Sequence, residues 1–120
     1  MRLRSPWKID RNDGLGLQRC DLPDVIAGTS PAEYRRTFNR PTGMVPGQRI
    51  WLSVHDWKGV LESLTINGHA AEVGGNRAPC QVDISNCLED HNLIELRLVA
   101  AGDVQPRLIG PVELGIQSVD

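Results

Sequence analysis

Five residues in two turn-rich segments have the side chains that a sugar-binding site requires. A pyranose ring presents apolar C–H faces and a rim of hydroxyl groups, so its site needs an aromatic platform beside planar hydrogen-bonding groups. An indole, an imidazole, a carboxylate, an amide and a guanidinium occur together here: His55, Asp56, Trp57, Asn76 and Arg77. We predict that these five residues form a ligand-binding site, with Trp57 as its platform. Tryptophans are more often partly buried than exposed, so a structural role for Trp57 is the alternative.

The chain shows no residue pattern that indicates a catalytic centre, and we predict that it is not an enzyme. No Gly-x-Ser-x-Gly nucleophile elbow is present. Glu62 is the one carboxylate in phase with an apolar face, that of Val60, Leu64 and Ile66. Such a carboxylate is either an acid with a perturbed pKa or a structural group. Because buried charges are normally paired, we favour a rim position or a partnership with Arg36 across the sandwich edge.

Metal and cofactor sites are not predicted either. Cys80 and Cys87 lack the close spacing of a zinc ligand pair, and Cys80 is in phase with the apolar Val82 and Ile84, which favours a core position. Residues 10–14 (DRNDG) have some of the residue types of a calcium loop. The distal Glu of an EF-hand is missing, so a plain turn is the preferred interpretation.

The elements that would position these residues are short alternating strands separated by Pro, Gly, Asn and Asp. Asn67-Gly68 predicts a type I′ hairpin, and residues 85–91 predict one short helical turn or a loop. Strands are expected at 34–38, 50–54, 60–66, 70–73, 80–84, 94–98 and 112–116. This pattern predicts an all-β antiparallel sandwich as a single domain over 1–120. Its core spans 34–116, and 1–33 form an N-terminal arm with one or two edge strands, pinned by Trp7.

Strand direction indicates where the recognition loops gather. If successive strands alternate in direction, four loops emerge at the same end of the sandwich. They are residues 28–33, 55–58, 74–79 and 101–107. Since loops at one end of a rigid scaffold commonly carry recognition, the five candidate residues are expected at that end.

Composition excludes several classes of function. The 120 residues include 13 basic and 15 acidic side chains, with a net charge of −2 and a pI near 5.9, so nucleic acid is not an expected partner. No polybasic run, signal peptide or membrane-spanning apolar segment is found, and we expect a cytoplasmic protein without membrane contact. Three cysteines, an odd number, are expected to be reduced thiols.

Several of the predicted strands and turns also carry a family resemblance. Its motifs, in order along the chain, are 34–38 (YRRTF), 47–52 (GQRIWL), 64–68 (LTING), 82–85 (VDIS), 92–98 (NLIELRL) and 109–114 (IGPVEL). This ordered set resembles the N-terminal sugar-binding domain of family 2 glycoside hydrolases, the β-galactosidase and β-glucuronidase group. The resemblance implies a galactose-binding-like jelly-roll sandwich without catalytic residues. In that family the catalytic carboxylates lie in a barrel, which this chain does not contain.

Three hypotheses follow, from three classes of function. The first is a free-standing, non-catalytic carbohydrate-binding module. The second is a protein-interaction domain, with a protein partner or a second copy of the chain, that uses an edge strand or a patch around Trp51. The third, ranked last, is an enzyme, which would need a pocket holding two carboxyl groups about 5 to 9.5 Å apart.

Overall fold

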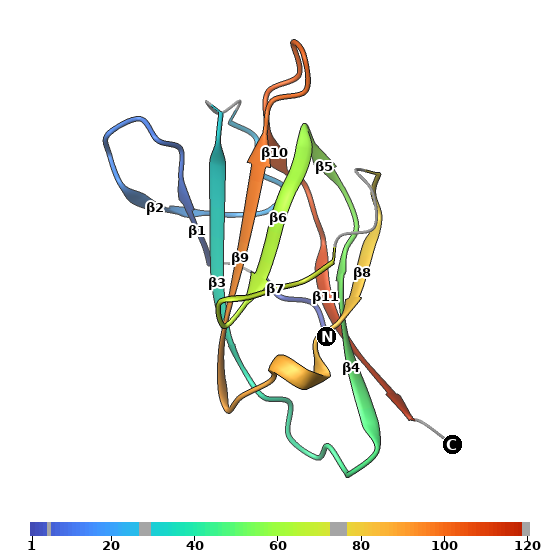
Figure 1. The fold of residues 1–120 in the computed structure, drawn as a ribbon. Coiled ribbons are helices and arrows are strands. Elements are labelled where there is room, and N and C mark those ends of the chain that lie inside the picture. Colours follow the sequence, from blue (N-terminus) through green and yellow to red (C-terminus); the bar gives the residue numbers. More distant parts are fainter. Residues whose placement is uncertain (5, 27–29, 73–76, 119–120) are drawn as a thin grey trace.

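The computed structural model describes residues 1–4, 6–26, 30–72 and 77–118 and folds them into two larger antiparallel β-sheets and one two-stranded pair (Figure 1). The larger sheet consists, in spatial order, of β2 (Leu17–Cys20), β1 (Trp7–Asp10), β3 (Ala32–Asn39), β9 (His91–Val99), β6 (Val60–Ile66) and β7 (His69–Ala70). The smaller sheet consists of β11 (Val112–Ser118), β4 (Gln48–Val54) and β8 (Cys80–Asp83). A short pair joins β10 (Arg107–Leu108) to β5 (Trp57–Lys58). The prediction of an all-β antiparallel sandwich is confirmed.

Alternating burial along the strands explains why the two sheets pack together. In β4 the side chains of Ile50, Leu52 and Val54 are buried, and those between them are only half-buried. β9 repeats this pattern with buried Ile94, Leu96 and Leu98. Successive side chains of a strand point to opposite faces, so each sheet presents one apolar face to a shared core. These inward faces match the prediction.

Strand register confirms that the described parts of the four predicted loops share one end. Ala32 at the start of β3 pairs with Leu98 near the end of β9, and Val60 at the start of β6 pairs with Val99. In the smaller sheet the end of β4 pairs with the start of β8. The loops before β3, between β4 and β6, before β8 and after β9 therefore emerge together, at the top of Figure 1.

The N-terminal residues form two strands of the larger sheet. β1 pairs with both β2 and β3, and β2 is the edge strand. Trp7 is fully buried, and its indole N–H donates a hydrogen bond to the backbone oxygen of Leu3 at 3.1 Å, which pins the preceding segment as predicted. In the turn after β1, the Asp10 carboxylate accepts a hydrogen bond from the Asn12 N–H, as a plain Asx turn does.

The Asn67-Gly68 hairpin also confirms its prediction. Both residues have positive φ, 53° and 80°, as a type I′ turn requires. The returning strand β7 covers His69–Ala70, however, so of the predicted strand 70–73 residues 71 and 72 are not in a strand, and Val73 lies outside the described residues. One helical turn occurs where a turn or loop was expected, the 3₁₀ helix η1 (Ser85–Cys87).

A β-bulge in β6 corrects the predicted inward face of that strand. The pairing with β9 shifts between Leu61 and Ser63, and the buried residues are therefore Leu61, Leu64 and Ile66. An extra residue in one strand reverses the side-chain alternation beyond it. The bulge places Glu62 at the surface, where it pairs with Arg97 at 2.9 Å and not with Arg36.

Two further predictions of burial can be compared with the structure. Cys80 is buried beside Val82 and Ile84, as expected for a small core residue. Ile116 was expected on the inward face of β11 but is 47% exposed, because the buried part of β11 ends at Leu114. No described helix is long and apolar enough to cross a membrane.

Candidate functional site

The structure corrects the role predicted for Trp57. This residue lies in β5 and is 6% exposed, as part of the hydrophobic core. An aromatic ring that stacks on a sugar must expose one face to the ligand. The buried indole of Trp57 exposes no such face. The inward and outward alternation of side chains in this region is interrupted by Gly59, whose φ is +87°. A Cβ atom added at this position would lie 2.4 Å from the Val99 backbone oxygen. This close approach fixes the turn that directs Trp57 inward.

The other candidate residues lie at the surface where they are described. The side chains of His55, Asp56 and Arg77 are exposed, and Asn76 lies outside the described residues. No hydrogen bond or ion pair joins any two of those three side chains. Instead, His55 Nε2 lies 3.7 Å from a carboxylate oxygen of Glu113. Their role in binding stays a prediction.

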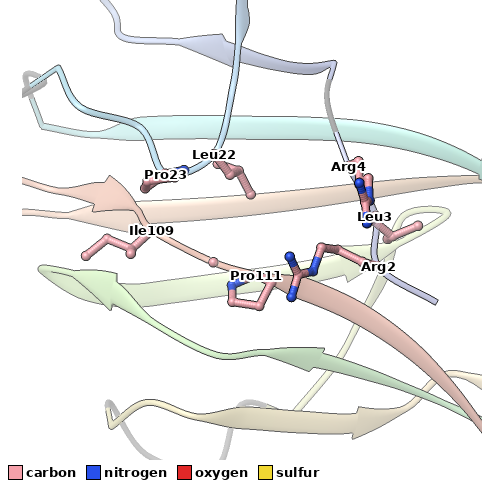
Figure 2. Close-up of a pocket in the computed structure, with 8 residues that line it drawn as sticks. Arg2, Leu3, Arg4, Leu22, Pro23, Ile109 and Pro111 are labelled. Carbon is pink, nitrogen blue, oxygen red and sulfur yellow. The ribbon is translucent and has the colours of Figure 1, made fainter.

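A groove lies next to the His55 loop, since the His55 N–H donates to the backbone oxygen of Pro111, a residue of the groove lining, at 3.0 Å. It has a volume of about 610 Å³ and combines two arginines with an apolar floor (Figure 2). We call it the N-terminal groove, lined by Arg2, Leu3, Arg4, Leu22, Pro23, Ile109, Gly110 and Pro111. Its volume falls within the range of small-molecule sites.

The N-terminal segment forms one wall of this groove because it extends the smaller sheet. Arg2 forms a bridge to Glu113 of β11, and the Leu3 N–H donates to the Val112 backbone oxygen at 2.8 Å. Leu3 is buried in the core, whereas Arg2 and Arg4 on either side of it are exposed. The alternation of an extended chain thus places both guanidinium-bearing residues outside the core.

The groove is continuous with the predicted recognition end. Arg2 Nε lies 3.9 Å from one carboxylate oxygen of Glu113, and the other oxygen of that carboxylate faces His55. The backbone N–H groups of Ile109 and Gly110 both donate to the backbone oxygen of Asp56, at 3.2 and 2.9 Å. The loop that contains His55 and Asp56 therefore supports the floor of the groove.

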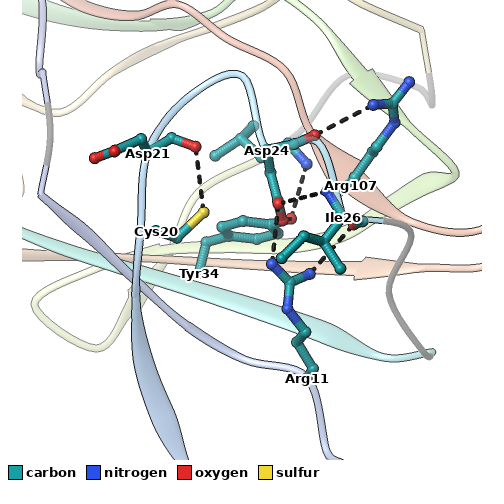
Figure 3. Close-up of polar contacts among 8 residues, drawn as sticks. Arg11, Cys20, Asp21, Asp24, Ile26, Tyr34 and Arg107 are labelled. Carbon is teal, nitrogen blue, oxygen red and sulfur yellow. Dashed lines mark hydrogen bonds and ion pairs between the residues drawn. The ribbon is translucent and has the colours of Figure 1, made fainter.

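A buried polar cluster holds the two apolar segments of the groove floor, residues 22–23 and 109–111, in place (Figure 3). Asp24 is 3% exposed and accepts hydrogen bonds from the Arg11 guanidinium at 2.9 Å and the Tyr34 hydroxyl at 2.5 Å. The Tyr34 hydroxyl in turn accepts from the Leu108 N–H at 3.0 Å, and the Asp24 N–H donates to the Leu108 backbone oxygen at 2.9 Å. Because Asp24 follows Pro23 and Leu108 precedes Ile109, this cluster fixes the distance between the two segments of the floor.

Electrostatics favour an ionised Asp24 in this cluster. Burial alone would raise the pKa of its carboxyl, but hydrogen bonds from Arg11, Tyr34 and the Ile26 N–H outweigh burial and hold that pKa below its usual value. Burial, together with the Asp24 charge, raises the pKa of the Tyr34 hydroxyl, which therefore stays protonated and donates. Burial and the same charge raise the pKa of Cys20 to about 11, so its thiol is neutral at physiological pH.

Gly110 allows residues 109–111, one segment of the groove floor, to approach Leu22 of the other segment closely. Its φ is +79°, and a Cβ at this position would lie 3.1 Å from the Leu22 Cδ1. A side chain at position 110 would displace the Leu22 side chain, either into the groove or away from residues 109–111. The shape of the groove therefore depends on a glycine at this position.

Sequence reasoning missed the groove because its walls come from three distant segments. Residues 2–4, 22–23 and 109–111 carry no shared motif, and the first two segments were assigned to the N-terminal arm. One signal was present: Tyr34 lies on an apolar inward face with a hydroxyl that needs a buried partner. That requirement indicates a buried acceptor but does not identify Asp24.

Metal chemistry finds no support in the described residues. Among residues 1–4, 6–26, 30–72 and 77–118, no group of three or more His, Cys, Asp or Glu side chains lies close enough to hold a metal ion. Within the same ranges Cys20, Cys80 and Cys87 are unpaired thiols.

Comparisons with known proteins identify the fold. No family model and no curated protein sequence matches the chain. Solved structures do: an FMN-binding β-glucuronidase from Faecalibacterium prausnitzii is similar at a TM-score of 0.74 and 18% identity, over 98% of this chain and 22% of that one. A glycosyl hydrolase family 2 member from Bacteroides cellulosilyticus gives a TM-score of 0.74 at 17% identity, over 98% of this chain and 20% of that one.

A rhamnosidase from Novosphingobium has the same sandwich, with a TM-score of 0.71 at 18% identity over 98% of this chain and 15% of its own. The chain thus spans about a fifth of the length of these glycosidases. At such low identity the match establishes the fold: a sandwich of the kind found as one domain in family 2 glycoside hydrolases. The resemblance inferred from the sequence motifs is confirmed at this level.

Proposed function

We propose that the chain is a non-catalytic β-sandwich domain that binds carbohydrate in the N-terminal groove. The observation that carries this proposal is the composition of the groove: an apolar floor of Leu22, Pro23, Ile109 and Pro111 beside the guanidiniums of Arg2 and Arg4. Aliphatic and proline side chains can pack against the C–H face of a sugar ring. Guanidiniums provide several planar hydrogen-bond donors for its hydroxyl oxygens.

The location of the groove supports the same proposal. It adjoins the sandwich end that carries His55, whose side chain is exposed and faces Glu113. These two residues form a polar rim next to the apolar floor. Ligand sites commonly combine a mainly apolar lining with a few polar groups that fix orientation.

Absence of catalysis is proposed on electrostatic grounds. Glycoside hydrolysis uses a pair of carboxyl groups, one of them with a raised pKa. None of the residues that line the N-terminal groove is acidic. At the buried Asp24 and the exposed Asp83, desolvation alone would raise the pKa, but hydrogen bonds to the carboxylate outweigh it and lower the pKa of both groups. This shift is opposite to that of a general acid.

Carbohydrate binding can be tested with a glycan array followed by calorimetric titration of the sugars that bind. The variant Ile109→Gln replaces an apolar residue of the groove floor, and Ile116→Gln makes the same change at an exposed position outside the groove. We expect Ile109→Gln to weaken binding about five- to tenfold, equivalent to about 1 kcal/mol of lost apolar contact, and Ile116→Gln to leave it unchanged. Absence of any bound glycan, or equal effects of the two variants, would contradict the proposal.

Protein contact is the second candidate function, favoured by exposed apolar side chains near the β1–β2 hairpin. Four of them lie within residues 15–26: Leu15, Leu17, Val25 and Ile26, with exposed fractions of 68, 45, 78 and 58%. Exposed large apolar side chains are common at interaction sites, and these four fall within one short segment of the sequence. Sedimentation analysis would show self-association through this segment as a concentration-dependent mass that Leu15→Ser together with Val25→Ser abolishes.

A further inference from the structure

Positive charge dominates the N-terminal groove, although the chain as a whole is negative. The chain has a net charge of −2, whereas the groove lining contains two arginines and no aspartate or glutamate. Glu113, which lies outside the lining, is 3.9 Å from Arg2 and is shared with His55. A concentration of one sign of charge in a concave surface attracts ligands of the opposite sign.

The two guanidiniums are available to a ligand. The Arg2 side chain is 55% exposed, and its contact with Glu113 is at the outer limit of an ion pair. Arg4 is exposed, and its guanidinium makes no hydrogen bond or ion pair with any residue in the described ranges. Its backbone oxygen accepts from Arg36 Nε at 2.7 Å, so the main chain is fixed while the side-chain end remains unengaged.

From this juxtaposition we infer that the N-terminal groove binds acidic sugars, those whose ring carries a carboxylate. This inference rests on the proposed carbohydrate-binding function and names its ligand class. A uronic acid residue matches both parts of the groove: its C–H face packs on Pro23, Ile109 and Pro111, and its carboxylate is paired by Arg2 and Arg4. Arginine binds a carboxylate through two parallel N–H···O bonds, which are stronger than hydrogen bonds between neutral groups.

The apolar floor distinguishes this ligand class from other anions. A free phosphate or a nucleic acid backbone would engage the guanidiniums but leave the apolar floor without a partner. An acidic peptide would supply carboxylates without the rigid C–H face of a pyranose. The acidic peptide is therefore a competing outcome of the test below.

The test is calorimetric titration of the full chain with oligogalacturonate and oligoglucuronate, each compared with its methyl ester. The ester keeps the ring and removes the charge. We expect the acids to bind at least about tenfold more tightly than the esters, and this difference to shrink between 20 and 200 mM salt because the Debye length falls.

Matched arginine variants identify the groups responsible. We expect Arg2→Gln and Arg4→Gln each to weaken binding of the acids about five- to twentyfold with little effect on the esters. Arg19→Gln, an exposed position on β2 outside the groove, is the control and should leave both affinities unchanged. Thermal unfolding of each variant checks that the fold is intact.

The alternative outcomes separate the two proposals. If acids and esters bind equally and the arginine variants have no effect, the acidic-sugar inference is overturned while carbohydrate binding stands. If neither acids nor esters nor any neutral glycan binds, both are overturned. If a poly-glutamate peptide binds as tightly as the acidic sugars and competes with them, the groove recognises carboxylates without a sugar, and the inference is wrong.

Discussion

At the scale of single residues, the buried pair of Arg11 and Asp24 connects the stability of the protein to its groove. As whole residues both are less than a tenth exposed, and the Arg11 guanidinium lies 2.9 Å from the Asp24 carboxylate. Burying two charges is costly, so such a pair is poor evidence of net stabilisation. Removing one partner, however, leaves the other charged and buried. The pair therefore specifies how segment 21–26 docks against residues 107–109.

The variant Asp24→Asn tests this interpretation. We expect it to lower the free energy of unfolding at pH 7 by about 3 to 5 kcal/mol, because Arg11 loses its buried counterion. Urea unfolding measures the change. Asp103→Asn, at an exposed loop position, is the control and should cost less than about 0.5 kcal/mol.

The same pair predicts a pH dependence. Because the folded state lowers the pKa of Asp24, its stabilising contribution is complete above the unfolded-state pKa of about 3.9 and is lost as pH falls through the folded-state pKa. The difference between the wild type and Asp24→Asn should therefore shrink below about pH 4. A difference that stays constant from pH 7 to pH 2 would contradict the lowered pKa.

Gly110 gives a second prediction at this scale. Gly110→Ala and Gly43→Ala both place a side chain at positive φ, +79° and +81°, but only the first brings a Cβ into contact, at 3.1 Å from Leu22. Each substitution should cost about 1 to 2 kcal/mol of backbone strain. Thermal unfolding should show an additional loss for Gly110→Ala, and its ligand affinity should fall while that of Gly43→Ala does not.

At the scale of elements, the buried faces of the strands follow the alternation of apolar and polar residues in the sequence, except where a β-bulge adds an extra residue to a strand. The inward faces of β4, β8 and β9 follow directly from apolar residues at every second position. In β6 the bulge at Leu61/Ser63 changes which residues face inward, and no local signal in the sequence marks it. The sequence favoured a rim position for Glu62 or a partnership with Arg36, but the pairing of Glu62 with Arg97 could not be predicted without the bulge.

Glu62 should consequently contribute little to stability. It shares Arg97 with Glu33, and the side chains of Arg97 and Glu62 are 42% and 50% exposed. Exposed ion pairs are typically worth less than about 1 kcal/mol. We expect Glu62→Ala to change the free energy of urea unfolding by less than about 0.5 kcal/mol. A loss of several kcal/mol would mean that the carboxylate is buried.

The β6–β7 turn depends on the side chain of Asn67 as well as on its positive φ. Its amide donates to the Cys87 backbone oxygen and to Asn92 Oδ1, both at 2.9 Å, and its own oxygen accepts from the Leu93 N–H at 2.8 Å. Glycine tolerates the same φ, so Asn67→Gly removes these hydrogen bonds without adding strain.

We expect Asn67→Gly to cost about 2 to 4 kcal/mol, since several part-buried hydrogen bonds are lost. Asn12→Gly is the matched control: Asn12 also has positive φ, 56°, but among the described residues its exposed side chain donates one hydrogen bond, to the Pro31 backbone oxygen. Chemical denaturation should therefore show a loss of about 1 kcal/mol or less for Asn12→Gly. Equal losses would indicate that only backbone conformation matters at these turns.

At the scale of the whole molecule, the local sequence pattern of strands and turns predicts the sandwich but does not predict where its binding surface lies. Alternation, turn residues and strand direction predicted the sheets and the shared loop end, because each depends on neighbouring residues or on strand parity. The groove depends on tertiary docking of three segments, the third of which begins at Ile109. Trp57 shows the converse: its residue type indicated a platform, but packing against the core buried it.

The central claim is that ligand recognition occurs in the N-terminal groove and not across the loop tips of the sandwich end. Amide chemical-shift mapping by NMR, during titration with an oligogalacturonate, tests it most directly. We predict that the perturbed amides cluster at Arg2, Leu3, Arg4, Leu22 and Ile109. Perturbations confined to the loop tips at 77–79 and 101–106, or no perturbation at millimolar ligand, would contradict the claim.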